Sequence, residues 1–138
     1  MSKHVREKEH GLNLPFMQNI GMRLCDVADD ELPQAVIDVT EQNCQPWGFL
    51  CGGATIAAAE TLAGVASCRR CPENVVVGMS VTANHIHSAS IGEQVMLTAT
   101  PIHIGQTTHV WRIDARNEHE HLISTVTVTN YIVTPQNQ

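Results

Sequence analysis

The sequence predicts an α+β fold in which an antiparallel sheet wraps around one central, buried helix. Residues 54–66 are good helix formers with apolar side chains on every side, which is typical of a helix enclosed by protein. After residue 72 the pattern alternates with a period of two, which indicates half-buried antiparallel strands. A sheet buries a single apolar helix most simply by curling around it.

The remaining elements are predicted in chain order from local composition. Residues 14–23 favour a short helix interrupted by Gly21, and two strands over 24–28 and 34–40 flank an acidic turn. After the central helix, the alternating segments and the turn residues between them predict four strands, over residues 75–85, 93–104, 108–116 and 121–133.

Alternation also predicts which strand residues share a face. In the 93–104 strand the core-facing set is Val95, Leu97 and Ala99. In the 108–116 strand it is Trp111, Ile113 and Ala115, and in the last strand Val126 and Val128. In the 75–85 strand the rule groups Val77, Met79, Val81, Ala83 and His85 against Gly78, Ser80, Thr82 and Asn84.

Length and charge limit the class of protein. We expect one domain over residues 14–134, preceded by a polar tail over 1–13. The formal net charge of -6 argues against nucleic acid or an anionic membrane surface as a partner. The charged N-terminus is followed by no apolar run long enough for a signal peptide or a membrane span, so we expect a cytoplasmic protein.

The cysteines and histidines give little support for a metal site. Five cysteines form an odd number without the density of a disulfide scaffold, which suits a reducing compartment. Cys68 and Cys71 have the spacing of half a zinc site, but no second pair lies at finger-like spacing. His119 and His121 fall in a hairpin tip and are interpreted as solvated turn residues. We expect neither a metal nor another cofactor.

Two features of the central helix point to chemistry. Glu60 is the only Asp, Glu, Lys, Arg or His between Glu41 and Arg69. Burying an unpaired carboxylate costs several kcal/mol, so we expect a buried Glu60 to be functional. Gly52 and Gly53 open the helix, where unpaired N–H groups and the positive end of the helix dipole suit a developing oxyanion.

The segment Gln45-Pro-Trp-Gly48-Phe-Leu-Cys51-Gly52-Gly53, followed by Glu60, resembles the signature loop and helix of hotdog-fold acyl-CoA thioesterases. The similarity is greatest to the branch that includes 4-hydroxybenzoyl-CoA, phenylacetate-pathway, enterobactin-pathway proofreading and 1,4-dihydroxy-2-naphthoyl-CoA thioesterases. Further matching segments at 75–78, 83–85, Gly92 and 101–105 follow in the family's order. The resemblance implies a hotdog fold and hydrolysis of an aromatic or medium-sized acyl-CoA.

The resemblance also implies site residues. Glu60 would be the nucleophile or the base that activates water, and the Gly52 N–H would polarise the thioester carbonyl. Gln45 and His85 would orient the acyl group and the attacking water or leaving group. Substrate contacts are expected at these positions: Cys51, Gly53, Gly64, Gly78, His85, Ile86, His87, Ser88, His103, Ile104, Gly105, Gln106, Thr107 and Thr108.

The spacing of Gly52 and Glu60 predicts a shared site. Eight residues of helix rise about 12 Å, whereas attack on a carbonyl requires approach to about 3 Å. One chain therefore cannot supply both groups to one thioester. We expect Gly52 of one chain to face Glu60 of another across a two-fold interface. The family resemblance implies a homodimer or a dimer of dimers.

Several alternatives remain open at this point. Cys51 stands where the family usually has histidine, so Cys51 could be the nucleophile with His85 as its base. Glu60 could instead form a structural ion pair with His85. The family resemblance also leaves open a hotdog dehydratase or hydratase, and a non-catalytic acyl-CoA-binding module.

Overall fold

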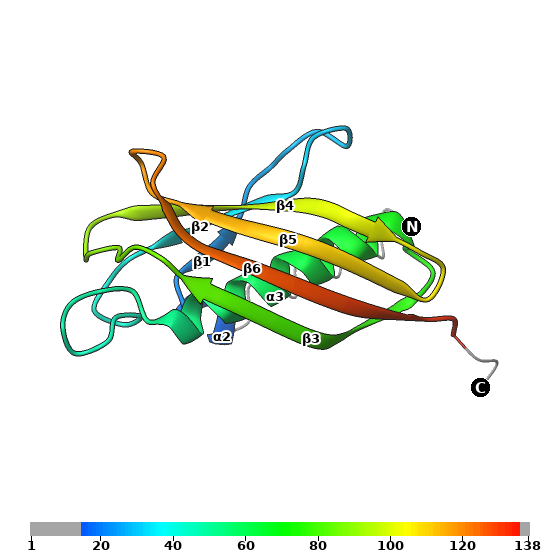
Figure 1. Ribbon diagram of the computed structural model, residues 1–138, viewed down its shortest axis with the longest axis horizontal. Coiled ribbons are helices and arrows are strands. Elements are labelled where there is room, and N and C mark those ends of the chain that lie inside the picture. Colours follow the sequence, from blue (N-terminus) through cyan, green and yellow to red (C-terminus); the bar gives the residue numbers. More distant parts are fainter. Residues whose placement is uncertain (1–14, 136–138) are drawn as a thin grey trace.

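The computed structural model describes residues 15–135, so the predicted tail over 1–13 lies outside the described residues. A short helix and two short strands precede the long helix, and four long strands follow it (Figure 1). In chain order the elements are α2 (Pro15–Asn19), β1 (Met22–Leu24), β2 (Gln34–Asp38), α3 (Gly52–Arg70), β3 (Val75–His85), β4 (Gln94–Ile104), β5 (Thr108–Arg116) and β6 (Leu122–Val133).

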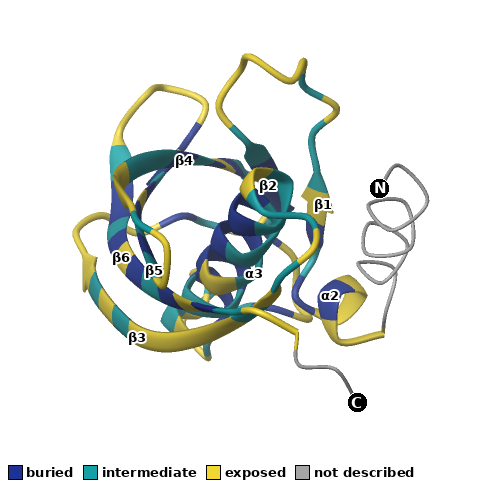
Figure 2. Cartoon of the chain, turned by 90° about the vertical axis from the view of Figure 1, so that its right-hand side faces the viewer, coloured by how far each residue is buried: buried dark blue, intermediate teal, exposed yellow. Residues whose placement is uncertain are grey.

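The six strands form one antiparallel sheet in the order β1-β2-β4-β5-β6-β3. The sheet curls around α3, which lies along its concave side (Figure 2). The predicted core residues of β4, β5 and β6 are all confirmed, since each is 0–1% exposed. The antiparallel sheet wrapped around a helix is therefore confirmed.

Near the N-terminus of the described region, the sequence-based prediction is partly wrong. The helix expected over 14–23 ends at Asn19, and residues 22–24 form β1 instead of continuing it. Gly21 causes the change of direction, because its φ of +72° is the left-handed conformation that favours glycine. The strand expected over 24–28 is also wrong, since β1 ends at Leu24. β2 ends at Asp38 rather than at residue 40.

The predicted face pattern of β3 is wrong for its first half. The pairing of β3 with β6 shifts between Gly78 and Ser80, which is a β-bulge at Met79. Gly78 pairs with the buried Asn130 and therefore lies on the same face as Val81 and His85, toward the helix. The extra residue displaces Met79 and the residues before it by one position relative to strict alternation.

The long helix is not enclosed on every side, contrary to the expectation from its composition. Its buried residues follow one stripe, at Ala54, Thr55, Ala58, Ala59, Leu62, Ala63, Ala66 and Ser67. Glu60 lies on the opposite side and is exposed. The sheet covers only one side of α3, and the small alanines allow close packing there without requiring burial elsewhere.

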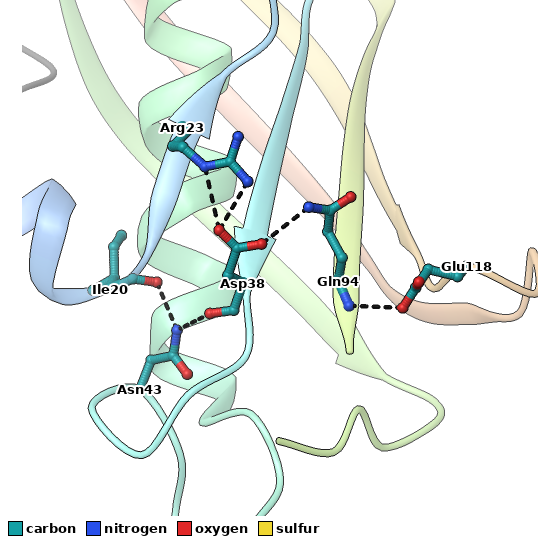
Figure 3. A network of polar contacts seen from close by, with 6 residues as sticks. All are labelled: Ile20, Arg23, Asp38, Asn43, Gln94 and Glu118. Atoms are coloured by element: carbon teal, nitrogen blue, oxygen red, sulfur yellow. Dashed lines mark hydrogen bonds and ion pairs between the residues drawn. The ribbon is translucent and has the colours of Figure 1, made fainter. Parts of the chain in front are cut away.

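A polar network ties the first strands to the rest of the sheet (Figure 3). Arg23 of β1 pairs with Asp38 of β2 at 2.8 Å, and Gln94 Nε2 of β4 donates to the same carboxylate at 3.0 Å. The backbone N–H of Gln94 donates to Glu118 Oε1 at 3.0 Å, which links in the turn between β5 and β6. These contacts join three strands and one turn on the surface.

Asn43 fixes the loop that leads to α3. Its Nδ2 donates to the carbonyls of Ile20 at 3.0 Å and Asp38 at 2.8 Å (Figure 3), and its Oδ1 accepts from the N–H of Thr40. Its own carbonyl accepts from the N–H of Cys51 at 2.8 Å. The side chain of Asn43 thus fixes the loop, and its main-chain carbonyl holds the residue that caps the long helix.

Candidate active site

A cavity of about 340 Å³ lies at the N-terminal end of α3. It is formed by the loop before α3, the first turn of α3, the end of β3 and the start of β6. Its lining residues are Gln45, Phe49, Leu50, Gly52, Thr55, His85, Ile86, His87, Ser88, Ala89, Ile123 and Ser124. Six predicted site residues are therefore brought together: Gln45, Gly52, His85, Ile86, His87 and Ser88.

The first turn of α3 contributes backbone donors to this end of the helix. Cys51 is the N-cap, and its side chain forms no capping hydrogen bond. Its carbonyl accepts from the N–H groups of Ala54 and Thr55, at 3.0 and 3.3 Å. The N–H groups of Gly52 and Gly53 precede these and belong to the first turn, whose donors lack partners within the helix.

His85 packs against the start of the helix. A Cβ placed on Gly52 would lie 2.6 Å from His85 Nε2, so glycine is needed for this close approach. On the other side of the ring, Nδ1 contacts Ser124 Oγ at 2.7 Å. Both nitrogens of the imidazole therefore have fixed neighbours, and Nε2 lies at the Gly52 side of the ring.

Gln45 holds its own loop in shape. Its Oε1 accepts from the N–H groups of Trp47 at 2.6 Å and Phe49 at 3.2 Å. Gly48 completes the turn with a φ of +87°. The carboxamide oxygen is thus engaged within the loop, at the edge of the cavity.

Glu60 lies away from this cavity. Its carboxylate rests over Gly78 of β3, where an added Cβ would overlap Oε2 and would lie 3.3 Å from Cδ. The prediction that Glu60 is buried is wrong for the single chain, because its helix face is uncovered. Gly64, one helical turn later, has no heavy atom within 4 Å of an added Cβ.

The predicted coenzyme-facing residues 103–108 run from the end of β4 through the turn to the start of β5, at the end of the sheet where α3 finishes (Figure 1). We call this segment the 103–108 turn. The Gly105 N–H donates to the Thr108 carbonyl at 2.9 Å, which closes the turn. A Cβ on Gly105 would lie 2.6 Å from His103 Nε2. Within one chain, these residues and the cavity lie at opposite ends of α3.

Comparison with known proteins identifies the family. Residues 48–124 match the model of the thioesterase superfamily, and this span contains Gly52, Glu60, Gly78 and His85. The chain belongs to the thioesterase superfamily. A 1,4-dihydroxy-2-naphthoyl-CoA hydrolase of Listeria monocytogenes is 37% identical over 78% of this chain and 87% of that protein. The enzyme of the same name from Escherichia coli is 34% identical over 83% of each chain.

Solved structures agree with this assignment. A thioesterase of Haemophilus influenzae superposes with a TM-score of 0.88 at 26% identity, covering 97% of this chain and 93% of that one. A thioesterase variant of Pseudomonas aeruginosa gives 0.86 at 28% identity, covering 95% and 94%. The expected hotdog fold is confirmed, and this thioesterase is an enzyme that hydrolyses thioesters.

The geometry of this thioesterase weakens two alternative interpretations. A structural ion pair between Glu60 and His85 within one chain is excluded, because Glu60 lies over Gly78, seven residues before His85 on β3, whereas the His85 ring packs against Gly52 of α3. A Cys51–His85 pair gains no support, since the ring contacts Ser124 and the Gly52 backbone. Cys51 is exposed at the cap of the helix.

Sequence reasoning missed Ser124, which fixes the His85 ring. The signal was present, because Ser124 shares the core-facing phase of β6 with Val126 and Val128. A hydroxyl on an apolar face needs a hydrogen-bond partner, so its position predicts a polar contact. The same reasoning applies to Asn130 at the other end of that face.

Two further findings concern membranes and metals. Over residues 15–135, no helix has the length and apolar character needed to cross a membrane. In the same region, His, Cys, Asp and Glu side chains do not gather in groups of three or more that could hold a metal ion.

Proposed function

We propose that this thioesterase hydrolyses an aromatic or medium-sized acyl-CoA at sites shared between two subunits. The relatives from Listeria and Escherichia are named as hydrolases of a naphthoyl-CoA, an aromatic acyl-CoA. A proofreading thioesterase of Cronobacter turicensis is 34% identical over 71% of each chain. These names support the substrate class, and the geometry supports the arrangement of the site.

One observation carries the proposal: Glu60 lies over Gly78, whereas His85 and Gly52 lie together at the cavity. Gly78 and His85 are seven residues apart on β3, which corresponds to about 20 Å of strand. The helix gives an independent separation of about 12 Å between residues 52 and 60. Both exceed the approach to about 3 Å that attack on one carbonyl requires.

The free edge of β3 offers the means of bringing the two halves together. β3 is the last strand of the sheet and is 11 residues long, with exposed apolar side chains at Val75, Val77 and Met79. An edge of this kind is suited to pairing with another strand. If two copies of β3 pair antiparallel about a two-fold axis at Thr82, with Met79 as the unpaired bulge residue, Gly78 lies opposite the partner subunit's His85.

In this arrangement each site combines an acid from one subunit with backbone donors from the other. The thioester carbonyl oxygen accepts a hydrogen bond from the Gly52 N–H, which stabilises the oxyanion. Glu60 takes the proton of an attacking water, or attacks directly to form an anhydride that water then hydrolyses. The C–S bond breaks, and the coenzyme leaves as a thiolate that takes up a proton. The products are a carboxylic acid and free coenzyme A.

Release of free thiol from benzoyl-CoA and from fatty acyl-CoA esters tests the activity. Hydrolysis of benzoyl-CoA supports the proposal, whereas binding without thiol release supports a binding module, and hydration of an enoyl-CoA supports a hydratase. Glu60→Gln is expected to lower kcat at least about 100-fold. Cys51→Ser is expected to retain most of kcat. The reverse pattern would identify Cys51 as the nucleophile.

Subunit mixing tests the shared site separately. Gly52→Pro removes the N–H at the first helical position, where the proline backbone is compatible with the helix. Its ring also takes the space of His85 Nε2, so both changes fall on the Gly52 half of the site. Glu60→Gln and Gly52→Pro subunits, each inactive alone, are unfolded, mixed and refolded together. Random pairing gives mixed dimers in about half of the cases, and each mixed dimer has one site with both groups intact and one site with neither. About a quarter of wild-type activity should therefore return. Sites confined to single chains would give no recovery.

A further inference from the structure

A buried polar cluster lies on the concave side of the sheet, at the end of α3 far from the cavity. It consists of Ser67 of α3, His109 and Trp111 of β5, and Asn130 of β6, each exposed by 3% or less. The proposed hydrolysis uses none of these side chains directly. Burial of four polar groups is costly unless they are hydrogen-bonded to one another, and here they are.

The hydrogen bonds around Ser67 determine how the cluster is protonated. Trp111 Nε1 and Asn130 Nδ2 can only donate, and they reach Ser67 Oγ at 2.8 and 3.0 Å. The Ser67 hydroxyl therefore donates its own proton to His109 Nδ1, at 2.8 Å. His109 is thus neutral, with its proton on Nε2 and with Nδ1 as an acceptor.

The other nitrogen of His109 reaches the turn between β4 and β5. A hydrogen bond with the Gly105 backbone favours the protonated form of the ring, so the ring is the donor in this bond. Because Nδ1 accepts from Ser67, the donor is Nε2 and the acceptor is the Gly105 carbonyl. Gly105 has His103 packed against its α-carbon, and its N–H closes the turn on Thr108. His109 therefore links this turn to the long helix through Ser67.

The charged and titratable groups near His109 are Arg70 at the end of α3 and His103 on β4. The Arg70 guanidinium lies 5.9 Å from the centre of the Trp111 ring, beside the cluster. Burial first, and then Arg70 and His103, lower the pKa of His109 and so favour its neutral form. The surroundings therefore maintain the protonation state that the two hydrogen bonds require.

We propose that His109 is a positioning residue that sets the conformation of the 103–108 turn and through it the affinity for the coenzyme A part of the substrate. This inference rests on the proposed function, because it takes the turn to contact coenzyme A. His109 acts without touching the reacting atoms. Loss of its bond to Gly105 should weaken binding of the coenzyme while leaving the chemical step unchanged.

Two variants separate the two bonds of the imidazole. In His109→Asn the amide occupies the place of Nδ1, so it keeps the contact with Ser67 and loses the contact with Gly105. In His109→Gln the longer side chain reaches the place of Nε2, so it keeps the contact with Gly105 and loses the one with Ser67. Each variant removes one hydrogen bond and serves as the folding control for the other, with thermal unfolding followed by circular dichroism.

Binding of free coenzyme A is measured by calorimetry, independently of hydrolysis. His109→Asn should raise the Kd about fivefold, and His109→Gln should leave it within about twofold of wild type. Equal effects of the two variants, no effect of His109→Asn, or no binding of coenzyme A by the wild type would each overturn the inference.

Hydrolysis of two benzoyl thioesters completes the test. For benzoyl-CoA, His109→Asn should raise KM with kcat unchanged, whereas KM for S-benzoyl-N-acetylcysteamine, which lacks the nucleotide, should stay the same. Equal changes in KM for both esters would contradict a role in coenzyme binding. Failure of the wild type to hydrolyse either ester would refute the proposed function, while calorimetry would still decide the role of His109.

Discussion

The Glu60 carboxylate lies so close to Gly78 that a methyl group on that glycine would overlap Oε2. Glycine at position 78 therefore provides the space in which the carboxylate lies, on the helix-facing side of an edge strand. The proposed nucleophile or base is positioned by β3 as well as by its own helix.

Replacement of Gly78 should therefore act on Glu60. Gly78→Ala is expected to displace the flexible carboxylate rather than the backbone, and a displacement of about 1 Å can lower a rate about 100-fold. We expect kcat for benzoyl-CoA to fall by about that factor with little change in thermal stability. Thr127→Ala, on the exposed outer face of β6, is the matched control. Normal kcat in Gly78→Ala would contradict the proposed role of Glu60.

Replacement of Gly64 by alanine should increase stability and reduce activity on large acyl groups. Because a Cβ there would meet no heavy atom within 4 Å in the chain, Gly64→Ala should fit and should raise the free energy of unfolding by about 1 kcal/mol. If the space beside Glu60 holds the acyl group, the same methyl group should lower kcat/KM for benzoyl-CoA about tenfold relative to acetyl-CoA. Urea unfolding and paired kinetic assays measure the two effects. An unchanged ratio would place the acyl group elsewhere.

Protonation of His109 should make the free energy of unfolding decrease in mild acid. Burial lowers its pKa, Arg70 and His103 lower it further, and the bond to Gly105 opposes part of the shift. Below the unfolded pKa of about 6.5, the unfolded chain binds a proton that the folded chain does not bind. Stability should therefore fall as the pH decreases from about 6.5 toward the lowered folded pKa, by at most about 1.4 kcal/mol per pH unit.

Urea unfolding between pH 7.5 and 5 measures this slope. The His109→Asn variant lacks the titrating group and should show a shallower dependence, by up to one proton. An identical slope in the variant would assign the acid sensitivity to other groups.

The polar contacts of the first strands should differ in their importance for stability. Asn43→Ala leaves buried carbonyl groups without a donor and should cost about 1–3 kcal/mol in the free energy of unfolding. Asp38→Asn should cost less than about 1 kcal/mol at pH 7, because the Asp38 side chain is 46% exposed and its pair with Arg23 is screened by solvent. Urea unfolding of both variants compares them directly, and a larger loss in Asp38→Asn would reverse this ranking.

Acid unfolding gives a second check on Asp38. Hydrogen bonds from Gln94 and then Arg23 lower the pKa of this carboxyl group. The contribution of Asp38 to the free energy of unfolding is therefore fully present above its unfolded pKa of about 3.9. It is lost as the pH falls through the lowered pKa of the folded state. The loss of the His109 contribution begins below about pH 6.5 and that of Asp38 below about pH 3.9, so the two losses start at different points of one titration.

Much of the fold was predictable because the strands after residue 72 alternate strongly. The strands over 75–85 and 108–116 have the predicted bounds, and those over 93–104 and 121–133 each begin one residue later. The short N-terminal elements were less predictable, since a five-residue helix and a three-residue strand contain too few positions to show a period. Their placement depends on long-range contacts such as that of Asn43 with Ile20.

Part of the geometry of the candidate site was predictable because a local motif carries it, and part was not because it depends on packing. The residues around Gly52 and His85 meet at one cavity, as the resemblance implied. The contact of Glu60 with Gly78 could not be read from the sequence, because counting in twos from His85 places Gly78 on the wrong face. The exposure of Glu60 was missed for a related reason. The small apolar residues of α3 are compatible both with burial under the sheet and with a helix face that a second subunit covers, so composition alone does not distinguish the two.

The bulge at Met79 has a consequence for how β3 can change. Without it, Met79 and Val77 would point beneath the long helix, and Gly78 would turn outward. The identity of the side chain at position 79 should therefore matter less than the number of residues between positions 78 and 85. Insertions or deletions of one residue in this stretch should be far more damaging than substitutions, because each would exchange the two sides of the strand and place a bulky group where the carboxylate now fits.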